Sequence, residues 1–139
     1  MALSAELLME KWSMLIVREA FYGVARFEDI LEDLKIPRSV LTTRLKQLVE
    51  IGVLERVPYR PEGSRTRYGY VLTHKGNDLG LTILALMQWG DKHLNNGVSS
   101  VSVFDKRSGE ALKVGLVPKG QASPGYSDLG LSFGTDRPR

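Results

Sequence analysis

The sequence contains no cysteine and only two histidines among its 139 residues. Disulfides, thiolate zinc sites and cysteine-based redox sensing are therefore excluded. The histidines, His74 and His93, fall at opposite ends of one expected helix, about 28 Å apart at 1.5 Å per residue. No phosphate-binding glycine loop, Ser-His-Asp order or metal-ligand spacing occurs. We therefore expect no catalytic site, no metal and no cofactor.

Long apolar runs are also missing. No apolar stretch reaches about 18 residues, the length that a membrane-spanning helix needs. The first residues, Met1 to Glu6, lack the basic region and apolar core of a signal peptide. We expect a cytoplasmic protein with no membrane partner. With 42% hydrophobic and 25% charged residues, the composition is that of one globular domain with an appendage.

One stretch with helical periodicity has a polar outer face. Leu41, Leu45 and Leu48 recur at the spacing of one buried stripe, which predicts a helix over residues 38–51. At about 100° per residue, its outward positions carry hydroxyl, amide and cationic groups: Arg38, Ser39, Thr42, Thr43, Lys46 and Gln47. Such groups reach base edges and phosphates when a helix lies in a DNA major groove. A solvated helix surface is the alternative interpretation.

A hairpin is expected directly after this helix. Gly52 stands where a left-handed cap residue is commonly needed. Extended segments at 54–59 and 66–72 flank a tip whose Pro and Gly mark a reversal. The basic side chains near this tip are Arg60, Arg65 and Arg67. They suit a phosphate-tracking or minor-groove element, although basic hairpin tips are also common on soluble proteins. Helix and hairpin together predict a winged helix-turn-helix with a wing over residues 54–72.

Positive charge concentrates in the same part of the chain. The net charge is only +3, but residues 38–75 carry 8 basic against 3 acidic groups, whereas residues 1–37 carry 4 against 7. A phosphate backbone would select this distribution. The acidic groups include Glu28 and Asp29, on the outer face of a second helix that should not lie on DNA. Arg44, on the flank of helix 38–51, could pair with either carboxylate or reach a phosphate.

Two terminal helices carry wider apolar faces than one compact core needs. The first is expected from Ser4 to Ala20, and the last from about Lys75 to Asn95 with Thr73 as its N-cap. The surplus suggests a second subunit, although packing within one chain explains the first helix equally well. The residues assigned to a homodimer interface are Leu8, Trp12, Leu79, Ile83, Leu86, Met87 and Trp89.

Residues 98–139 form an expected C-terminal extension to a domain spanning residues 1–97. Residues 101–104 alternate, 106–109 indicate a turn, and 111–117 return as a second strand, which predicts an added hairpin over about 100–117. Beyond Pro118 the chain is rich in Gly, Ser and Pro, so we expect a mobile tail. Four side chains in that tail could still dock on a neighbour: Tyr126, Leu129, Leu131 and Phe133.

Roughly residues 11–93 resemble the HxlR-type winged helix-turn-helix transcriptional regulators. The motifs that carry the resemblance are Lys11-Trp12, Leu15-Ile16-Val17-Arg18-Glu19, Gly23, Arg26-Phe27, Leu41-Thr42-Thr43-Arg44-Leu45, Gly52-Val53-Leu54-Glu55-Arg56, Tyr70-Val71-Leu72-Thr73, Gly76 and Trp89-Gly90. The resemblance implies a homodimer that binds double-stranded DNA without catalysing a reaction. The expected fold is mainly α (α+β): a winged helix-turn-helix with a two-stranded wing, a long C-terminal dimerisation helix and an added hairpin.

These observations predict a sequence-specific regulator of bacterial type that reads a pseudo-palindromic operator. Helix 38–51 would lie in the major groove, and wing 54–72 on the backbone or in the minor groove. Two alternatives stay open. One is a winged helix used for protein–protein assembly, since the fold does not require DNA. The other is a regulator that binds a small effector in the dimer cleft.

Overall fold

The computed structural model describes residues 2–134. The chain divides into two compact units between Leu79 and Gly80, so the boundary expected at residue 97 falls inside the second unit. Within residues 2–134, no helix combines the length and apolar character that crossing a membrane requires.

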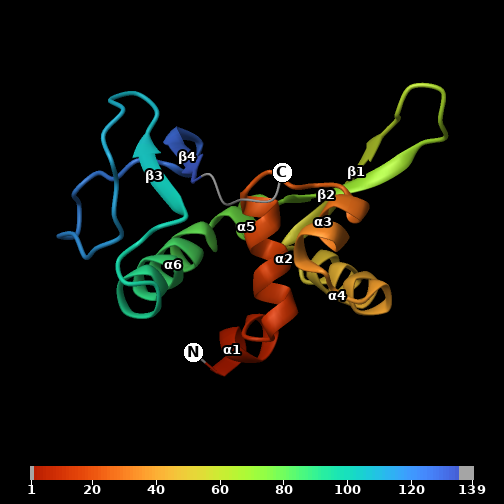
Figure 1. Ribbon diagram of the computed structural model, residues 1–139, viewed down its shortest axis with the longest axis horizontal. Helices are drawn as coiled ribbons and strands as arrows, with labels where there is room; N and C mark the ends of the chain where they lie inside the picture. The colour runs from red at the N-terminus through yellow and green to blue at the C-terminus, as the bar shows by residue number, and fades with distance from the viewer. Residues whose placement is uncertain (1, 135–139) are drawn as a thin grey trace. The chain divides into compact units, whose positions relative to one another are not determined.

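The first unit contains a cluster of helices and a projecting hairpin (Figure 1). Its elements are α1 (Ala2–Leu8), α2 (Lys11–Phe21), α3 (Phe27–Leu34), α4 (Arg38–Glu50), β1 (Leu54–Tyr59), β2 (Arg67–Leu72) and α5 (His74–Asn77). Four of these elements supply the most deeply buried side chains: Ile16, Val17, Ile30, Leu41, Leu45, Leu48 and Leu54. The leucine stripe predicted for α4 is therefore part of the core.

The prediction of a single first helix from Ser4 to Ala20 is wrong. The helix is interrupted at Met9 and Glu10, and α2 begins anew with Glu10 as its N-cap in extended conformation. The Glu10 carboxylate accepts hydrogen bonds from the backbone N–H groups of Trp12 and Ser13, both at 3.1 Å. A carboxylate that accepts hydrogen bonds from two otherwise unpaired N–H groups favours a new helix start over a continuous helix. The spacing of apolar residues does not reveal such a cap.

The end of α4 explains how a helix becomes a strand within three residues. Gly52 has a φ of +73°, the left-handed conformation that glycine adopts at low cost. Its N–H donates to the carbonyl of Val49, and the N–H of Val53 donates to the carbonyl of Leu48. This pair of bonds is the Schellman arrangement. It stops the helix and directs Val53 and Leu54 into the core, where they are 2% and 1% exposed.

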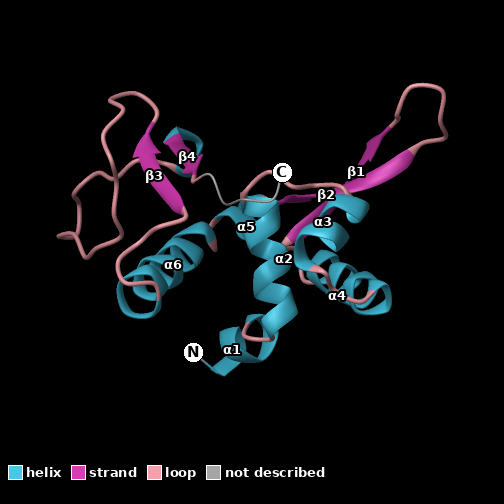
Figure 2. Cartoon of the chain, in the orientation of Figure 1, coloured by secondary structure: helices cyan, strands magenta, loops and turns pink. Residues whose placement is uncertain are grey.

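The wing is an antiparallel pair, β1 with β2, in a register that runs from Leu54 opposite Leu72 to Tyr59 opposite Arg67 (Figure 2). The second strand begins one residue later than expected. Its other edge is also occupied, because Arg26 forms an isolated bridge with Gly69 and the N–H of Tyr70 donates to the carbonyl of Ala25 at 2.7 Å. The wing base is thereby fixed to the segment that precedes α3.

The long helix expected from Lys75 to Asn95 is also interrupted. Thr73 is the N-cap as predicted, since its hydroxyl accepts a hydrogen bond from the N–H of Gly76 at 3.0 Å. The helix that follows, α5, ends at Asn77, and α6 (Gly80–Leu94) starts after two further residues. Gly76 and Gly80 lower the helix propensity of this stretch by about 1 kcal/mol each relative to alanine, which explains why the interruption falls here.

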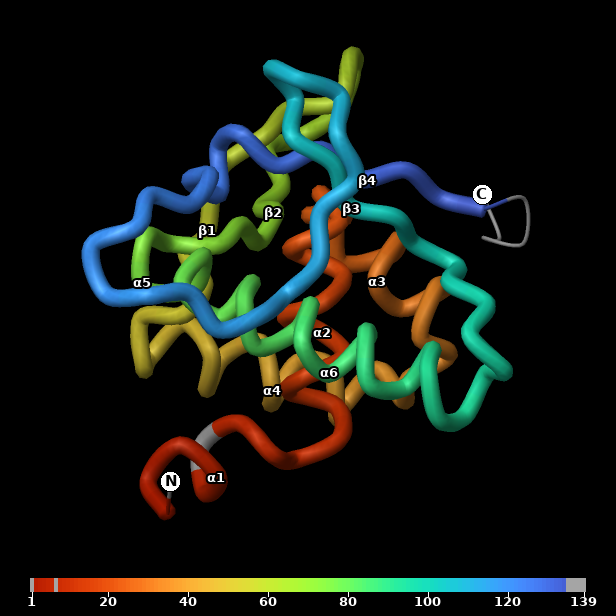
Figure 3. The backbone as a smooth tube through the Cα atoms, turned by 90° about the vertical axis from the view of Figure 1, so that its left-hand side faces the viewer, coloured from red at the N-terminus to blue at the C-terminus, as the bar shows by residue number. Residues whose placement is uncertain are grey.

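The second unit contains α6, β3 (Val101–Asp105), a short 3-10 helix (Tyr126–Asp128) and β4 (Leu129–Phe133). The hairpin predicted over residues 100–117 is largely wrong, because the regular partner of β3 is β4. Residues 110–112 do turn back beside β3, but they contribute only a single bridge, between Ala111 and Phe104. Figure 3 shows the long connection from β3 to β4.

Local packing explains the choice of partner strand. Gly130 lies opposite Phe104, and a Cβ atom on Gly130 would fall 2.3 Å from atoms of the phenyl ring. The ring therefore occupies the space over the glycine. The prediction of a mobile tail beyond Pro118 is consequently wrong for residues 126–133, because Leu129, Leu131 and Phe133 belong to β4. The end of the predicted tail, residues 135–139, lies outside the described residues.

Candidate nucleic-acid interface

The exposed face of α4 is polar, as the sequence predicts. The exposed side chains on the helix include Arg38, Ser39, Thr42, Thr43, Lys46 and Gln47. The hydroxyls of Thr42 and Thr43 donate to the carbonyls four residues earlier, at 2.9 and 3.0 Å. Their protons are thus committed, while the oxygen lone pairs can still accept and the methyl groups remain. Toward base edges, both threonines offer an acceptor for an amino group and an apolar contact for a thymine methyl.

Arg38 is exposed but already has an acidic partner. Its two terminal nitrogens donate to both carboxylate oxygens of Glu28 on α3, at 2.9 and 2.8 Å, and both side chains are 61% exposed. The guanidinium also lies 5.2 Å from the centroid of the Phe27 ring. The hydrogen bonds from Arg38 lower the pKa of Glu28, and the charges of Arg38 and Arg67 lower it further. A phosphate or base that binds Arg38 must therefore compete with the Glu28 carboxylate for the guanidinium.

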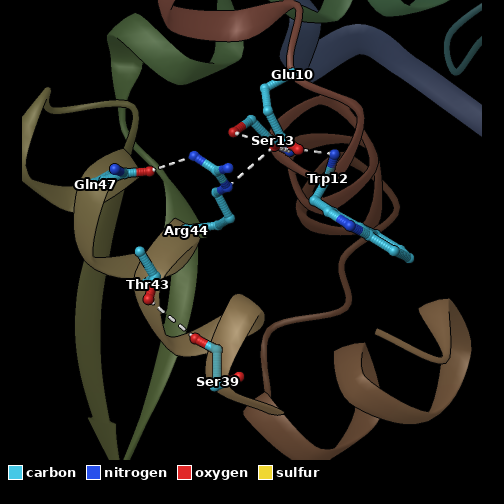
Figure 4. Close-up of polar contacts among 7 residues, drawn as sticks. All are labelled: Glu10, Trp12, Ser13, Ser39, Thr43, Arg44 and Gln47. Carbon is cyan, nitrogen blue, oxygen red and sulfur yellow. Dashed lines mark hydrogen bonds and ion pairs between the residues drawn. The ribbon is translucent and has the colours of Figure 1, made fainter. Parts of the chain in front are cut away.

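For Arg44 the sequence suggested Glu28, Asp29 or a phosphate as a partner, whereas the structure places Glu10 and Gln47 beside it. Its Nε atom lies 3.1 Å from Oε2 of Glu10, the residue that caps α2. Its terminal nitrogen donates to Oε1 of Gln47 at 2.9 Å. Figure 4 shows Arg44 between these two partners. Glu28 is bound instead by Arg38, six residues earlier on α4.

The remaining cation on the face of α4 is only loosely held. The ammonium group of Lys46 lies 3.8 Å from the Glu50 carboxylate, and the two side chains are 77% and 60% exposed. A pair this exposed contributes little to stability. Lys46 can therefore exchange Glu50 for a phosphate at small cost.

The wing arginines differ in how firmly they are held. The Nε–H of Arg60 donates to the carbonyl of Ser64 at 3.0 Å, which closes the hairpin tip over itself. Arg65 and Arg67 are exposed. Arg67 begins β2, two residues before Gly69, which forms a bridge with Arg26 beside the start of α3. Its charge also lowers the pKa of Glu28. The three arginines therefore extend from the tip toward the helices.

Two further arginines beside the wing were missed by the sequence reasoning. The Arg56 guanidinium lies 4.1 Å from the centroid of the Tyr68 ring, and that of Arg26 lies 5.0 Å from the Tyr59 ring. Both arginines are exposed. Flat guanidinium groups held over aromatic rings are well placed to track phosphates. Arg56 belongs to the basic segment 38–75, but its side chain covers the ring of Tyr68, although the strand register places it opposite Tyr70.

The residues assigned to dimerisation differ widely in exposure. Leu86 and Trp89 on α6 are 58% and 54% exposed. Leu8, Trp12, Leu79 and Met87 are half-buried. Ile83 is only 3% exposed and therefore belongs to the core of the chain. The dimerisation assignment left out two exposed leucines of α6: Leu94, which shares the apolar face predicted for this helix, and Leu81; they are 75% and 54% exposed.

A polar-faced helix preceded by α3 and followed by a two-stranded hairpin defines the winged helix-turn-helix class. Residues 7–98 match the model of the HxlR-like helix-turn-helix family, and the chain belongs to this family. The resemblance carried by the sequence motifs is thereby confirmed.

Relatives and solved structures agree with this assignment. An uncharacterized HTH-type transcriptional regulator of Mycobacterium tuberculosis is 49% identical over 89 residues, which are 64% of this chain and 55% of that protein. One from Synechocystis sp. is 33% identical over 90 residues, 64% of this chain and 65% of that protein. The chain thus spans little more than half the length of the mycobacterial relative.

Among solved structures, that of PA1607, a candidate transcription factor, has a TM-score of 0.70 at 34% identity, covering 87% of this chain and 84% of that one. The reduced form of the transcriptional regulator YodB from B. subtilis has a TM-score of 0.58 at 28% identity, covering 70% of this chain and 95% of that one.

Proposed function

We propose that this chain is a sequence-specific, dimeric DNA-binding transcriptional regulator. In this proposal α4 lies in the major groove of a pseudo-palindromic operator, and the wing lies on the backbone or in the minor groove. The observation that carries the proposal is the wholly polar exposed face of α4, opposite its buried leucines. An exposed apolar patch there would have favoured protein–protein assembly. The relatives, which are named as transcriptional regulators, also support it.

Selection from a random duplex library tests the proposal directly. The selected site is then titrated against scrambled DNA at fixed, near-physiological salt. We expect an inverted repeat whose half-sites lie about 34 Å apart, one turn of DNA, because a two-fold axis relates the two α4 helices. The ratio of specific to non-specific affinity should exceed about 10³. Failure of every sequence to become enriched would contradict the proposal.

The wing arginines should contribute affinity without base preference. Replacing Arg65 or Arg67 by alanine should weaken binding to all sequences and reduce the slope of log K against log salt by about 0.9 per lost phosphate contact. Arg107→Ala is the matched control, since Arg107 is an exposed cation of the second unit paired with Asp128 at 3.0 Å. It should leave the slope unchanged. A wing variant that alters base preference at an unchanged slope would refute the assigned role.

The dimer is tested separately by sedimentation equilibrium without DNA. If α6 supplies the interface, a carboxylate in place of Trp89 or Leu86 should raise the dimer dissociation constant, because an unpaired charge is costly to bury. Leu116→Glu serves as the control, because Leu116 is fully exposed on the connection between β3 and β4. Equal dissociation constants for the Trp89→Glu and Leu116→Glu variants would remove α6 from the interface.

A further inference from the structure

The start of α2 and the middle of α4 are joined by a chain of polar contacts (Figure 4). Oε2 of Glu10 accepts from the backbone N–H groups of Trp12 and Ser13, from the Ser13 hydroxyl at 3.3 Å, and lies 3.1 Å from Arg44 Nε. Arg44 then donates to Oε1 of Gln47.

Arg44 is more deeply buried than the other cations of α4. Its side chain is 30% exposed, whereas Arg38 is 61% and Lys46 is 77% exposed. The Nε atom is shielded from solvent and, among the described residues, meets Glu10 as an ion pair rather than in hydrogen-bond geometry. The charge of Arg44 is thus offset by the carboxylate of Glu10, which is held in place by its hydrogen bonds to the first N–H groups of α2. A cation balanced in this way adds little to the release of counterions from DNA.

The contact with Arg44 determines which end of the Gln47 amide is directed outward. A guanidinium only donates hydrogen bonds, so the amide oxygen of Gln47 must face Arg44 and the NH₂ group must face away. Reading adenine bidentately requires both ends of the amide, the oxygen for N6 and the nitrogen for N7. An anchored oxygen disfavours that arrangement. The NH₂ group that remains finds two acceptors on guanine, O6 and N7, but on adenine only N7, beside an amino group that it cannot satisfy.

We infer that Arg44 is a positioning residue that presents Gln47 to DNA as a hydrogen-bond donor, so that α4 selects guanine over adenine at the base pair facing Gln47. The inference rests on the proposed function. The anchor also reduces the rotamer freedom that Gln47 would lose on binding, which favours the complex. Glu10 takes part by holding Arg44 from α2, outside the helix that contacts DNA.

The first test concerns the free protein and requires no operator. The chain has three glutamines, which supply their own references in a measurement of side-chain amide ¹⁵N relaxation. Gln88 is tied at both ends to the backbone of Val114, at 3.0 and 2.9 Å. Gln121 is exposed. Gln47 should be restrained like Gln88 and should become as mobile as Gln121 in Arg44→Lys, which keeps the charge but lacks the fork that reaches two partners. Mobility equal to that of Gln121 in the unaltered protein would overturn the inference.

The second test compares operators selected by the unaltered chain, Arg44→Lys and Glu10→Gln. Glutamine at position 10 keeps an acceptor for the α2 cap but loses the charge that holds Arg44. Both variants should shift one position of each half-site toward adenine by at least about fivefold at an unchanged salt slope. In a Gln47→Ala background, Arg44→Lys should have no effect on preference.

Other outcomes separate the inference from the proposed function. A salt slope reduced by about 0.9 in Arg44→Gln, without a change of preference, would make Arg44 a phosphate contact and overturn the inference. Failure of all proteins to enrich any sequence would refute the proposed function and, with it, the base assignment. The relaxation measurement would then still decide whether Arg44 anchors Gln47.

Discussion

Gly76 occupies a position where even one added carbon should destabilise the wing base. A Cβ atom there would fall 2.1 Å from the carbonyl oxygen of Val53 and 3.0 Å from a methyl carbon of Leu72. The first contact is with backbone and cannot be relieved by a rotamer change. The same carbonyl accepts a hydrogen bond from the N–H of Thr73 at 3.1 Å, so moving it disturbs the start of α5.

The expected size of the Gly76→Ala effect follows from these contacts. Overpacking of this kind costs about 1–3 kcal/mol, and weakening the Thr73 hydrogen bond costs about 1 kcal/mol. The higher helix propensity of alanine offsets about 1 kcal/mol. The net loss of about 2 kcal/mol should lower Tm by about 5–15 °C in a chain of this size.

Thermal unfolding followed by circular dichroism measures this change. Gly90→Ala is the matched control, because nothing lies within 4 Å of a Cβ atom added to Gly90 in α6. That variant should gain roughly 0.5–1 kcal/mol from helix propensity alone. The two substitutions therefore have opposite expected signs. A Gly76→Ala variant that melts within about 2 °C of the unaltered protein would refute the close approach to Val53.

Two further predictions concern polar contacts of the first unit. Thr73→Ala should destabilise by about 1 kcal/mol, because it removes the cap on Gly76 and the 2.6 Å hydrogen bond to the carbonyl of Gly52; Thr73→Ser should restore most of the loss in urea unfolding. For Glu28, a carbon-detected carboxyl titration should give a pKa below its ordinary value of 4.5 that rises when Arg38 is replaced by glutamine. Because the folded-state pKa is depressed, the stability from this pair is complete above pH 4.5 and is lost as pH falls through the folded value. An unchanged Glu28 pKa in Arg38→Gln would contradict the pairing.

The parts of the fold that could be predicted are those specified by local pattern. The leucine stripe of α4, the glycine after it and the alternation of the wing each lie within a few residues, and all three recur in the structure. The errors occur where residues far apart in the sequence determine which segments pack together. Nothing within residues 100–117 indicates that β3 pairs with β4, because the reason is the fit of Phe104 over Gly130.

In the candidate site, too, the direction of each side chain could be predicted from the sequence, but its partner could not. Helical periodicity correctly predicted which α4 residues face outward. It could not predict that Arg38 binds Glu28 or that Arg44 binds Glu10, since Glu28 lies on α3 and Glu10 caps α2. Ile83 illustrates the converse difficulty, because an apolar residue on a wide stripe has no feature that separates core from interface. Periodicity indicates the direction of a side chain, and only tertiary packing determines what it meets.

The pairing of β3 with β4 also imposes an order of events during folding. β4 begins 24 residues after β3 ends, at Leu129 after Asp105. Closing a connection of this length costs more chain entropy than closing a tight hairpin. Until β4 has docked, β3 has exposed backbone on its β4 edge, and only residues 110–112 are available to cover the other edge. A chain that has not yet closed this connection therefore presents an open strand edge with which strands of neighbouring molecules can pair.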